Sequence, residues 1–330
     1  MNIYTTLKEL CLCPSVSGRE EAVREKIKSF ITPFCHDVRI DKLGNLIARK
    51  QGHGGRRIMM AAHMDEIGFL VTMIEDSGLV RIAPVGGISF TAAAFCGVVS
   101  EKGVKGTVVP NADVKPDSYK SDVFYIDIGA KGKKSAEKKV SIGDFFVLTP
   151  KLDRLMGSRV CGRPLDDRVG CAVLLDIAQR LWEKETKDDI YYVFSVQEEV
   201  GCRGAGTAAF SIAPDVALCF DVTATGDTPS SKPMACSLGG GAAVKIKDAS
   251  VICSEEIITS LCDIAEKKKI KYQREILLFG GTDTSSMQLA GSGAAVGALS
   301  IPTRYIHSGC EVCDLEDAKA CTDIAVEFIN

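Results

Sequence analysis

The chain contains five residues of the types that bind divalent metal ions, spread over most of its length: His63, Asp166, Glu199, Asp221 and His307. One carboxylate that bridges two ions, with a further carboxylate and an imidazole on each side, completes the ligand set of a two-metal centre. Two ions roughly 3.5 to 4 Å apart turn a shared water molecule into a nucleophile and stabilise the oxyanion that it creates. The set therefore predicts a metallohydrolase.

The adjacent carboxylates Glu198 and Glu199 come at the end of an apolar, strand-like run, residues 189–197. Neighbouring side chains of an extended chain point to opposite sides, so one carboxylate can bind metal while the other acts as general base. A glycosidase instead needs two carboxylates that face each other across a sugar, about 5 to 9.5 Å apart. A solvated acidic loop is the alternative without chemistry.

His63 and Asp65 also follow an apolar run, and their spacing of two places both side chains on the same side of an extended backbone. Asp65 can then accept a hydrogen bond from the imidazole and orient it. A surface-facing pair is the alternative. The surrounding AAHMDEIGF is otherwise strongly apolar, so charged residues there need a reason.

Asp166 and Asp167 are adjacent at the predicted start of a helix, where either can cap the helix or bridge two ions. His307 alone would be interpreted as a buried structural histidine. The chain has only four histidines, however, and the other two candidates, His36 and His53, lie in a helix-to-strand connection and a glycine-rich loop. This short inventory favours His307 as a ligand.

The pattern of apolar residues predicts the elements that position these groups. Residues 17–20 read as a capping box before a helix at about 18–31, and strands are expected at 37–41, 45–50 and 56–63. Short strand-like runs without a long helix fill residues 68–161, and helices then alternate with strands. We predict a mixed-sheet α/β catalytic domain from residues 1–67 and 162–330, with a small, all-β, barrel-like domain inserted at 68–161.

Composition excludes several classes of protein. The 330 residues carry a net charge of -3, contain no long apolar run and begin without a secretory signal, which predicts a cytoplasmic protein with no nucleic-acid or membrane partner. The 14 cysteines are spread through apolar patterns and are expected to be reduced thiols. The lysine-rich residues 131–139 are expected to form a solvated loop of the insertion.

The chain contains six motifs in this order, and the resemblance that they carry covers nearly its whole length: AAHMDEIGF, PLDDRVGC, SVQEEVGCRGA, DVTATGDTP, GGTDTSSMQ and IPTRYIHSGCEVCDLED. Together they resemble the cocatalytic metallo-aminopeptidases that include glutamyl, lysyl and deblocking aminopeptidases and the tetrahedral archaeal enzymes. The resemblance implies that His63, Asp166 and Asp221 bind one ion and that Asp166, Glu199 and His307 bind the other. It makes Glu198 the general base, Asp65 the residue behind His63, and Asp166 the bridge, with Asp167 as the alternative bridge.

The resemblance also implies removal of amino-terminal residues from short peptides, an insertion that forms dimers, and assembly into a tetrahedral dodecamer. Imidazole and carboxylate ligands suit two zinc or cobalt ions per subunit, or manganese. A dinuclear deacylase or carboxypeptidase that acts on N-acylated substrates is the alternative function. The chain departs from the usual pattern mainly in its cysteines, at Cys202, Cys310 and Cys313.

Overall fold

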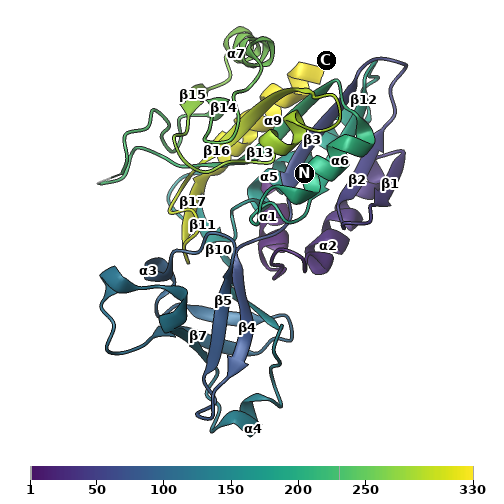
Figure 1. Ribbon diagram of the computed structural model, residues 1–330. Coiled ribbons are helices and arrows are strands. Elements are labelled where there is room, and N and C mark those ends of the chain that lie inside the picture. The colour runs from purple at the N-terminus through teal and green to yellow at the C-terminus, as the bar shows by residue number, and fades with distance from the viewer. Residues whose placement is uncertain (1, 230, 330) are drawn as a thin grey trace.

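The chain forms two parts of unequal size, which a computed structural model describes for residues 2–229 and 231–329 (Figure 1). The larger part is a mixed sheet covered by helices, and the smaller part is a barrel that extends from one end of it. The predicted fold class, an α/β protein with a β insertion, is confirmed.

The large sheet has the strand order β1-β2-β12-β3-β13-β16-β17-β11-β10, and β14 joins it beside β16 with β15 beyond. Its strands are β1 (Asp37–Ile40), β2 (Leu46–Lys50), β3 (Arg57–His63), β10 (Lys151–Arg154), β11 (Arg159–Arg163), β12 (Asp189–Ser195), β13 (Val216–Thr223), β14 (Ala242–Lys247), β15 (Tyr272–Ile276), β16 (Ala295–Arg304) and β17 (Glu311–Asp314).

Four central strands of this sheet, β12, β3, β13 and β16, run parallel to one another. Their residues are almost all buried, as expected for strands covered on both faces. Parallel strands end at the same edge of a sheet, and that edge collects ligands in open α/β folds. The predicted metal-binding residues come from this edge.

Helices cover both faces of the sheet. One layer contains α1 (Ile3–Cys11), α2 (Glu21–Ile31), α5 (Arg168–Trp182) and α9 (Leu315–Ile329), and α7 (Glu255–Lys268) packs on α9. The shorter helices α6 (Arg203–Ile212) and α8 (Thr284–Gln288) lie on the opposite face (Figure 1). Within the described ranges, no helix has the length and apolar character needed to span a membrane.

The insertion is a closed barrel with the strand order β4-β5-β8-β7-β6-β9. Its strands are β4 (Gly68–Ile74), β5 (Val80–Val85), β6 (Gly97–Ser100), β7 (Lys105–Pro110), β8 (Phe124–Asp127) and β9 (Phe145–Leu148). The short helices α3 (Phe90–Ala93) and α4 (Lys133–Ala136) and the 3-10 turns η2 (Pro116–Ser118) and η3 (Ser121–Val123) connect them, while η1 (Thr32–Phe34) follows α2. Phe69, Phe124 and Phe146 fill a core separate from that of the large sheet.

The division of the chain at residues 67/68 and 161/162 stays a prediction. The barrel strands end at Leu148, and β10 and β11, which lie before or at residue 163, pair within the large sheet. The chain therefore re-enters the large sheet earlier than residue 161.

The capping box predicted at residues 17–20 is wrong. Helix α2 begins at Glu21, and no side chain caps its first turn. The Ser17 hydroxyl instead donates to Asp65 Oδ2 at 2.6 Å, and Glu20 accepts from the backbone of Gly18 and Gln197. A buried carboxylate has a greater need of donors than an exposed helix end, and it takes the hydroxyl.

Candidate functional site

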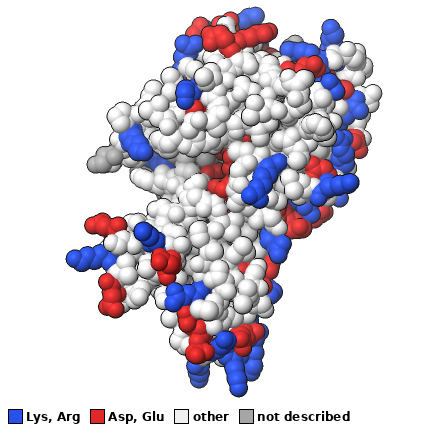
Figure 2. All heavy atoms as spheres, in the orientation of Figure 1, with Lys and Arg blue, Asp and Glu red and all other residues white. Residues whose placement is uncertain are grey.

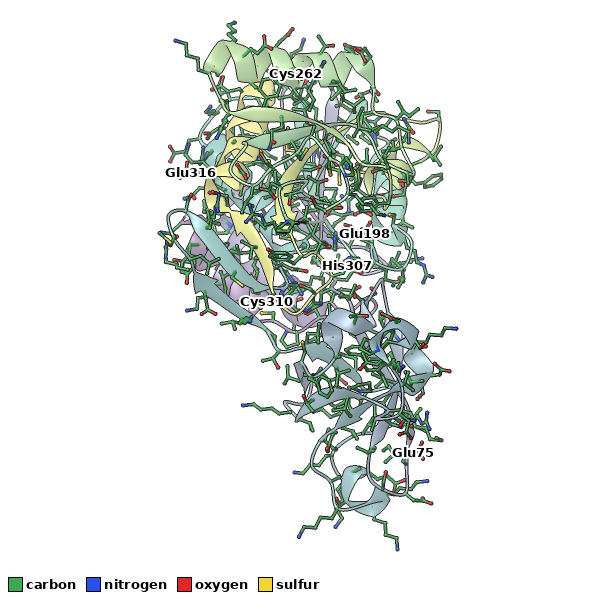
Figure 3. All side chains as sticks on the ribbon, turned by 90° about the vertical axis from the view of Figure 1, so that its left-hand side faces the viewer. Glu75, Glu198, Cys262, His307, Cys310 and Glu316 are labelled. Atoms are coloured by element: carbon green, nitrogen blue, oxygen red, sulfur yellow. The ribbon has the colours of Figure 1, made fainter. Side chains whose placement is uncertain are left out.

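The five predicted metal-binding residues meet at the carboxyl edge of the parallel strands. His63 ends β3 and lies beside Ser195, the last residue of β12, after which come Glu198 and Glu199. Asp221 lies near the end of β13, and His307 follows β16. Figure 3 shows Glu198 and His307 near each other, at the level where the large sheet meets the barrel.

Asp166 lies between the two imidazoles. Its Oδ1 is 3.0 Å from His63 Nε2, and its Oδ2 is 3.2 Å from His307 Nε2. Asp221 Oδ1 approaches the same nitrogen of His63 at 3.8 Å, and Glu199 Oε2 lies 3.3 Å from His307 Nε2. The five residues thus form two groups, each with an imidazole and a carboxylate of its own, and Asp166 is common to both.

The charges of this cluster fit divalent cations. Burial would lower the pKa of His307, yet the carboxylates of Asp166 and Glu199 raise it to about 11. Burial and the nearby carboxylates raise the pKa of Asp221 well above its ordinary value. Glu199 Oε1 is buried without a hydrogen-bond partner. The cluster therefore offers imidazole nitrogens and an unpaired carboxylate oxygen, which are ligand atoms that zinc prefers. Its excess of negative charge would balance the charge of a divalent ion.

Asp65 is fully buried behind His63 and is held from three directions. His63 Nδ1 lies 3.1 Å from the Asp65 carbonyl oxygen and 3.4 Å from its Oδ1. The carboxylate also accepts from the Ser17 hydroxyl and from the backbone amides of Glu198 and Glu199. Asp65 therefore orients the imidazole and positions the acidic pair at once.

The two neighbouring aspartates have different surroundings. Asp167 Oδ1 accepts from the amide of Gly170 at 3.0 Å and so caps α5, while its Oδ2 accepts from the amide of His63 at 3.2 Å. Both Asp167 oxygens are occupied by backbone groups, whereas both Asp166 oxygens face imidazole nitrogens. This difference favours Asp166 as the bridge.

Glu198 lines the cavity beside these groups without an imidazole in contact with its carboxylate. Burial, together with the charges of Asp221 and Asp283, raises its pKa well above the ordinary value of a glutamate. A carboxylate with a raised pKa holds a proton more readily, which suits a group that must take up a proton and return it. The thiol of Cys202 donates to its Oε1 at 3.1 Å.

Two residues that hold His307 were not predicted. Gly87, in the loop after β5 of the barrel, accepts from His307 Nδ1 through its carbonyl oxygen at 2.8 Å. Glu311 accepts from the amides of His307, Leu165 and Asp166 through its buried carboxylate. The EVCD stretch that contains Glu311 lies four residues after His307, but nothing in the sequence pairs it with residues 165 and 166.

The cavity next to the cluster has a volume of about 600 Å³. Figure 2 shows acidic side chains inside the hollow between the two parts of the molecule. Beyond the predicted metal-binding residues and Glu198, most of its wall is apolar or carries hydroxyl groups, with Leu277, Phe279, Ile306, Thr225 and Thr228 among its members. Arg304 is a cationic group of this wall, and Asp227 binds it through two hydrogen bonds, at 3.0 and 2.7 Å.

Comparison with known proteins finds relatives that are named as aminopeptidases or peptidases. A provisionally named aminopeptidase of Acetivibrio thermocellus is 44% identical over 329 residues, which are 99% of this chain and 98% of that protein. The structure of an aminopeptidase from the archaeon Desulfurococcus kamchatkensis matches with a TM-score of 0.95 and 35% identity, over 99% of this chain and 94% of the other. The TET1 peptidase of Pyrococcus horikoshii, described as able to assemble into a tetrahedron or a large octahedral shell, matches with a TM-score of 0.88 and 34% identity over 99% of both chains.

The sequence model for the M42 glutamyl aminopeptidases matches residues 44–324 of the chain. This range begins before β2 and ends inside α9, so it includes the predicted metal-binding residues, the predicted general base and the whole barrel. The chain therefore belongs to the M42 glutamyl aminopeptidase family.

Proposed function

We propose that this chain is a metal-dependent aminopeptidase that removes residues from the free amino termini of short peptides. The observation that carries the proposal is the position of Asp166, whose two oxygens face the imidazoles of His63 and His307 at 3.0 and 3.2 Å. Only a carboxylate shared in this way can serve two ions at once. The relatives named above are aminopeptidases or peptidases, which supports the same reaction.

The residues that would hold the ions are His63, Asp166 and Asp221 for one, and Asp166, Glu199 and His307 for the other. When bound, such ions lower the pKa of a water molecule and polarise the carbonyl group of the substrate. Zinc, cobalt and manganese all suit these ligands, and zinc and cobalt fit the two imidazoles best.

Glu198 acts as the general base in this proposal. It lines the cavity and has a raised pKa because it is buried. Its carboxylate takes a proton from the attacking water and passes that proton to the amine that leaves when the peptide bond breaks. Asp65 keeps His63 oriented, and its hydrogen bonds to the amides of Glu198 and Glu199 hold both carboxylates at the edge of the cavity.

Assembly is the second part of the proposal. We infer that the barrel forms dimers and that dimers assemble into a tetrahedral dodecamer, because the TET1 peptidase of Pyrococcus horikoshii can form a tetrahedron. The barrel carries exposed apolar side chains suited to an interface, such as Phe95 and Ile142, which are 71% and 70% exposed. Light scattering after size-exclusion chromatography measures the mass of the assembly. We also propose a cytoplasmic location, because the 14 cysteines are spread through apolar patterns and are expected to be reduced.

The deciding experiment compares free and N-acetylated peptides as substrates of the metal-loaded enzyme. Stepwise release of the first residue from free peptides, abolished by EDTA and restored by zinc or cobalt, is the expected result. Cleavage of acetylated substrates alone would keep the two-metal centre but replace the aminopeptidase by a deacylase, which none of the relatives described above suggests.

A further inference from the structure

A second cluster of metal-ligating side chains lies beside the two-metal centre. Glu198, Cys202 and Asp283 each present one ligand atom, and these atoms lie within 4.8 Å of one another. The three residues come from different elements: Glu198 follows β12, Cys202 precedes α6, and Asp283 precedes α8. The proposed reaction uses Glu198 but gives no role to the other two.

Asp283 is the part of this cluster that most needs a partner. The residue is only 1% exposed, and its Oδ2 accepts a hydrogen bond from Ser195 Oγ. Its Oδ1 is buried without any hydrogen-bond partner. Burial raises the pKa of Asp283 to about 6, and the imidazole of His63 is the cationic group that acts on it and on Glu198. A buried carboxylate oxygen with no donor is costly unless a cation or a proton reaches it.

Cys202 gives the cluster its chemical selectivity. Its thiol lies on the wall of the cavity, and its Sγ donates to Glu198 Oε1 at 3.1 Å. A sulfur ligand beside two carboxylates favours thiophilic ions such as zinc and cadmium over magnesium or manganese. Cys202 lies directly before α6, so the start of that helix fixes the position of the thiol in the cluster.

We propose that Glu198, Cys202 and Asp283 form a third, inhibitory site for a thiophilic divalent ion. An ion held there binds the carboxylate of Glu198, which would otherwise accept a proton from water, so occupancy of the site stops the reaction. The inhibition rests on the proposed role of Glu198 as general base, whereas binding of the ion does not.

Binding exchanges a proton for the ion. The S–H bond of Cys202 breaks, a sulfur–metal bond forms, and the proton leaves to solvent through the cavity. Because burial raises the pKa of this thiol, the ion competes with a firmly held proton. We therefore expect the third site to fill only when the ion is in excess.

The test titrates enzyme that carries two zinc ions per subunit with Cd²⁺. The ultraviolet charge-transfer band of a cadmium–thiolate bond shows whether Cys202 binds the ion. The rate of peptide release shows whether Glu198 can still act as the general base. In the unmodified enzyme the absorption is expected to grow in step with the loss of activity. Cys202→Ser is expected to lose that absorption, and both Cys202→Ser and Asp283→Asn to raise the half-inhibiting Cd²⁺ concentration by about tenfold or more.

Cys310→Ser is the matched control, because Cys310 is an exposed thiol near His307 but lies outside the cluster. It is expected to keep the inhibition of the unmodified enzyme, and excess Mn²⁺ is expected to inhibit none of the proteins. An unchanged half-inhibiting concentration in both Cys202→Ser and Asp283→Asn would overturn the inference. An enzyme without peptidase activity would refute the proposed function instead, while the absorption would still report whether Cys202 binds the ion.

Discussion

Replacing Glu198 by glutamine separates proton transfer from metal binding more cleanly than any other change in this site. Glutamine has the shape of glutamate, and its carbonyl oxygen can still accept the hydrogen bond that Cys202 donates to Glu198. The backbone bond from residue 198 to Asp65 does not depend on the side chain. The nearby carboxylates of Asp221 and Asp283 disfavour a negative charge on Glu198. Replacing Glu198 by a neutral side chain is therefore not expected to destabilise the fold.

The Glu198→Gln enzyme is expected to lose the part of the reaction rate that a positioned general base contributes. Such groups contribute about a hundredfold to ten-thousandfold to a rate. At about 1.4 kcal/mol for each factor of ten, the transition state loses about 3 to 5 kcal/mol of stabilisation. The loss should appear in kcat rather than in KM, because Glu198 accepts the proton only during the reaction.

The assay measures kcat and KM for release of the first residue of a peptide, and elemental analysis counts the bound metal. Glu199→Gln is the paired control, since Glu199 contacts His307 and is expected to bind metal. We expect Glu198→Gln to keep two ions per subunit with a much lower kcat, and Glu199→Gln to lose an ion. A Glu198→Gln enzyme with two ions and a kcat close to the unmodified value would refute the assignment of the base.

Three further changes test other contacts of the site. His307→Ala should weaken the binding of one ion by about a hundredfold or more while circular dichroism stays unchanged, and two ions still bound tightly would remove His307 from the ligands. Gly87→Ala places a Cβ 3.1 Å from His307 Nδ1; it should lower metal affinity or activity about tenfold, and normal values for both would show that the imidazole does not need this support. The wall of the cavity predicts faster cleavage of leucyl than of glutamyl peptides, because Asp227 neutralises Arg304. Asp227→Asn should raise the glutamyl-to-leucyl ratio of kcat/KM by about fivefold, the equivalent of about 1 kcal/mol for a partly exposed ion pair, and an unchanged ratio would exclude Arg304 from side-chain recognition.

The elements of the catalytic part could be predicted because their patterns are long and regular. The buried strands β3 and β12 lie where the apolar runs placed them, and α5 begins where the start of a helix was predicted. The capping box failed for a reason that local sequence does not contain. Ser17 and Glu20 are drawn to Asp65 and to the backbone of Gln197, and both partners are distant in the chain.

The supporting residues of the site could not be predicted because their roles depend on contacts between separate segments. Gly87 belongs to the barrel, yet its carbonyl oxygen orients His307, which lies 220 residues later. A Cβ at this position would come within 3.1 Å of the imidazole and would press against it. The barrel thus contacts a proposed metal-binding residue directly, so an insertion predicted only to form dimers also helps to position the candidate site.

Asp166 and Asp167 are adjacent and identical in type, but their hydrogen bonds give one a structural role and leave the other for the proposed metal site. Helix α5 begins at Arg168, so the carboxylate of residue 167 lies where it can cap the first turn, and it also accepts from the amide of His63. With both oxygens engaged by backbone amides, Asp167 holds the end of β3 against the start of α5. Asp166 has its amide bound by Glu311 and its oxygens directed at the two imidazoles. The aspartate that caps the helix therefore leaves its neighbour free for its proposed role as the bridge between two ions. Asp167→Asn should reduce stability more than metal binding.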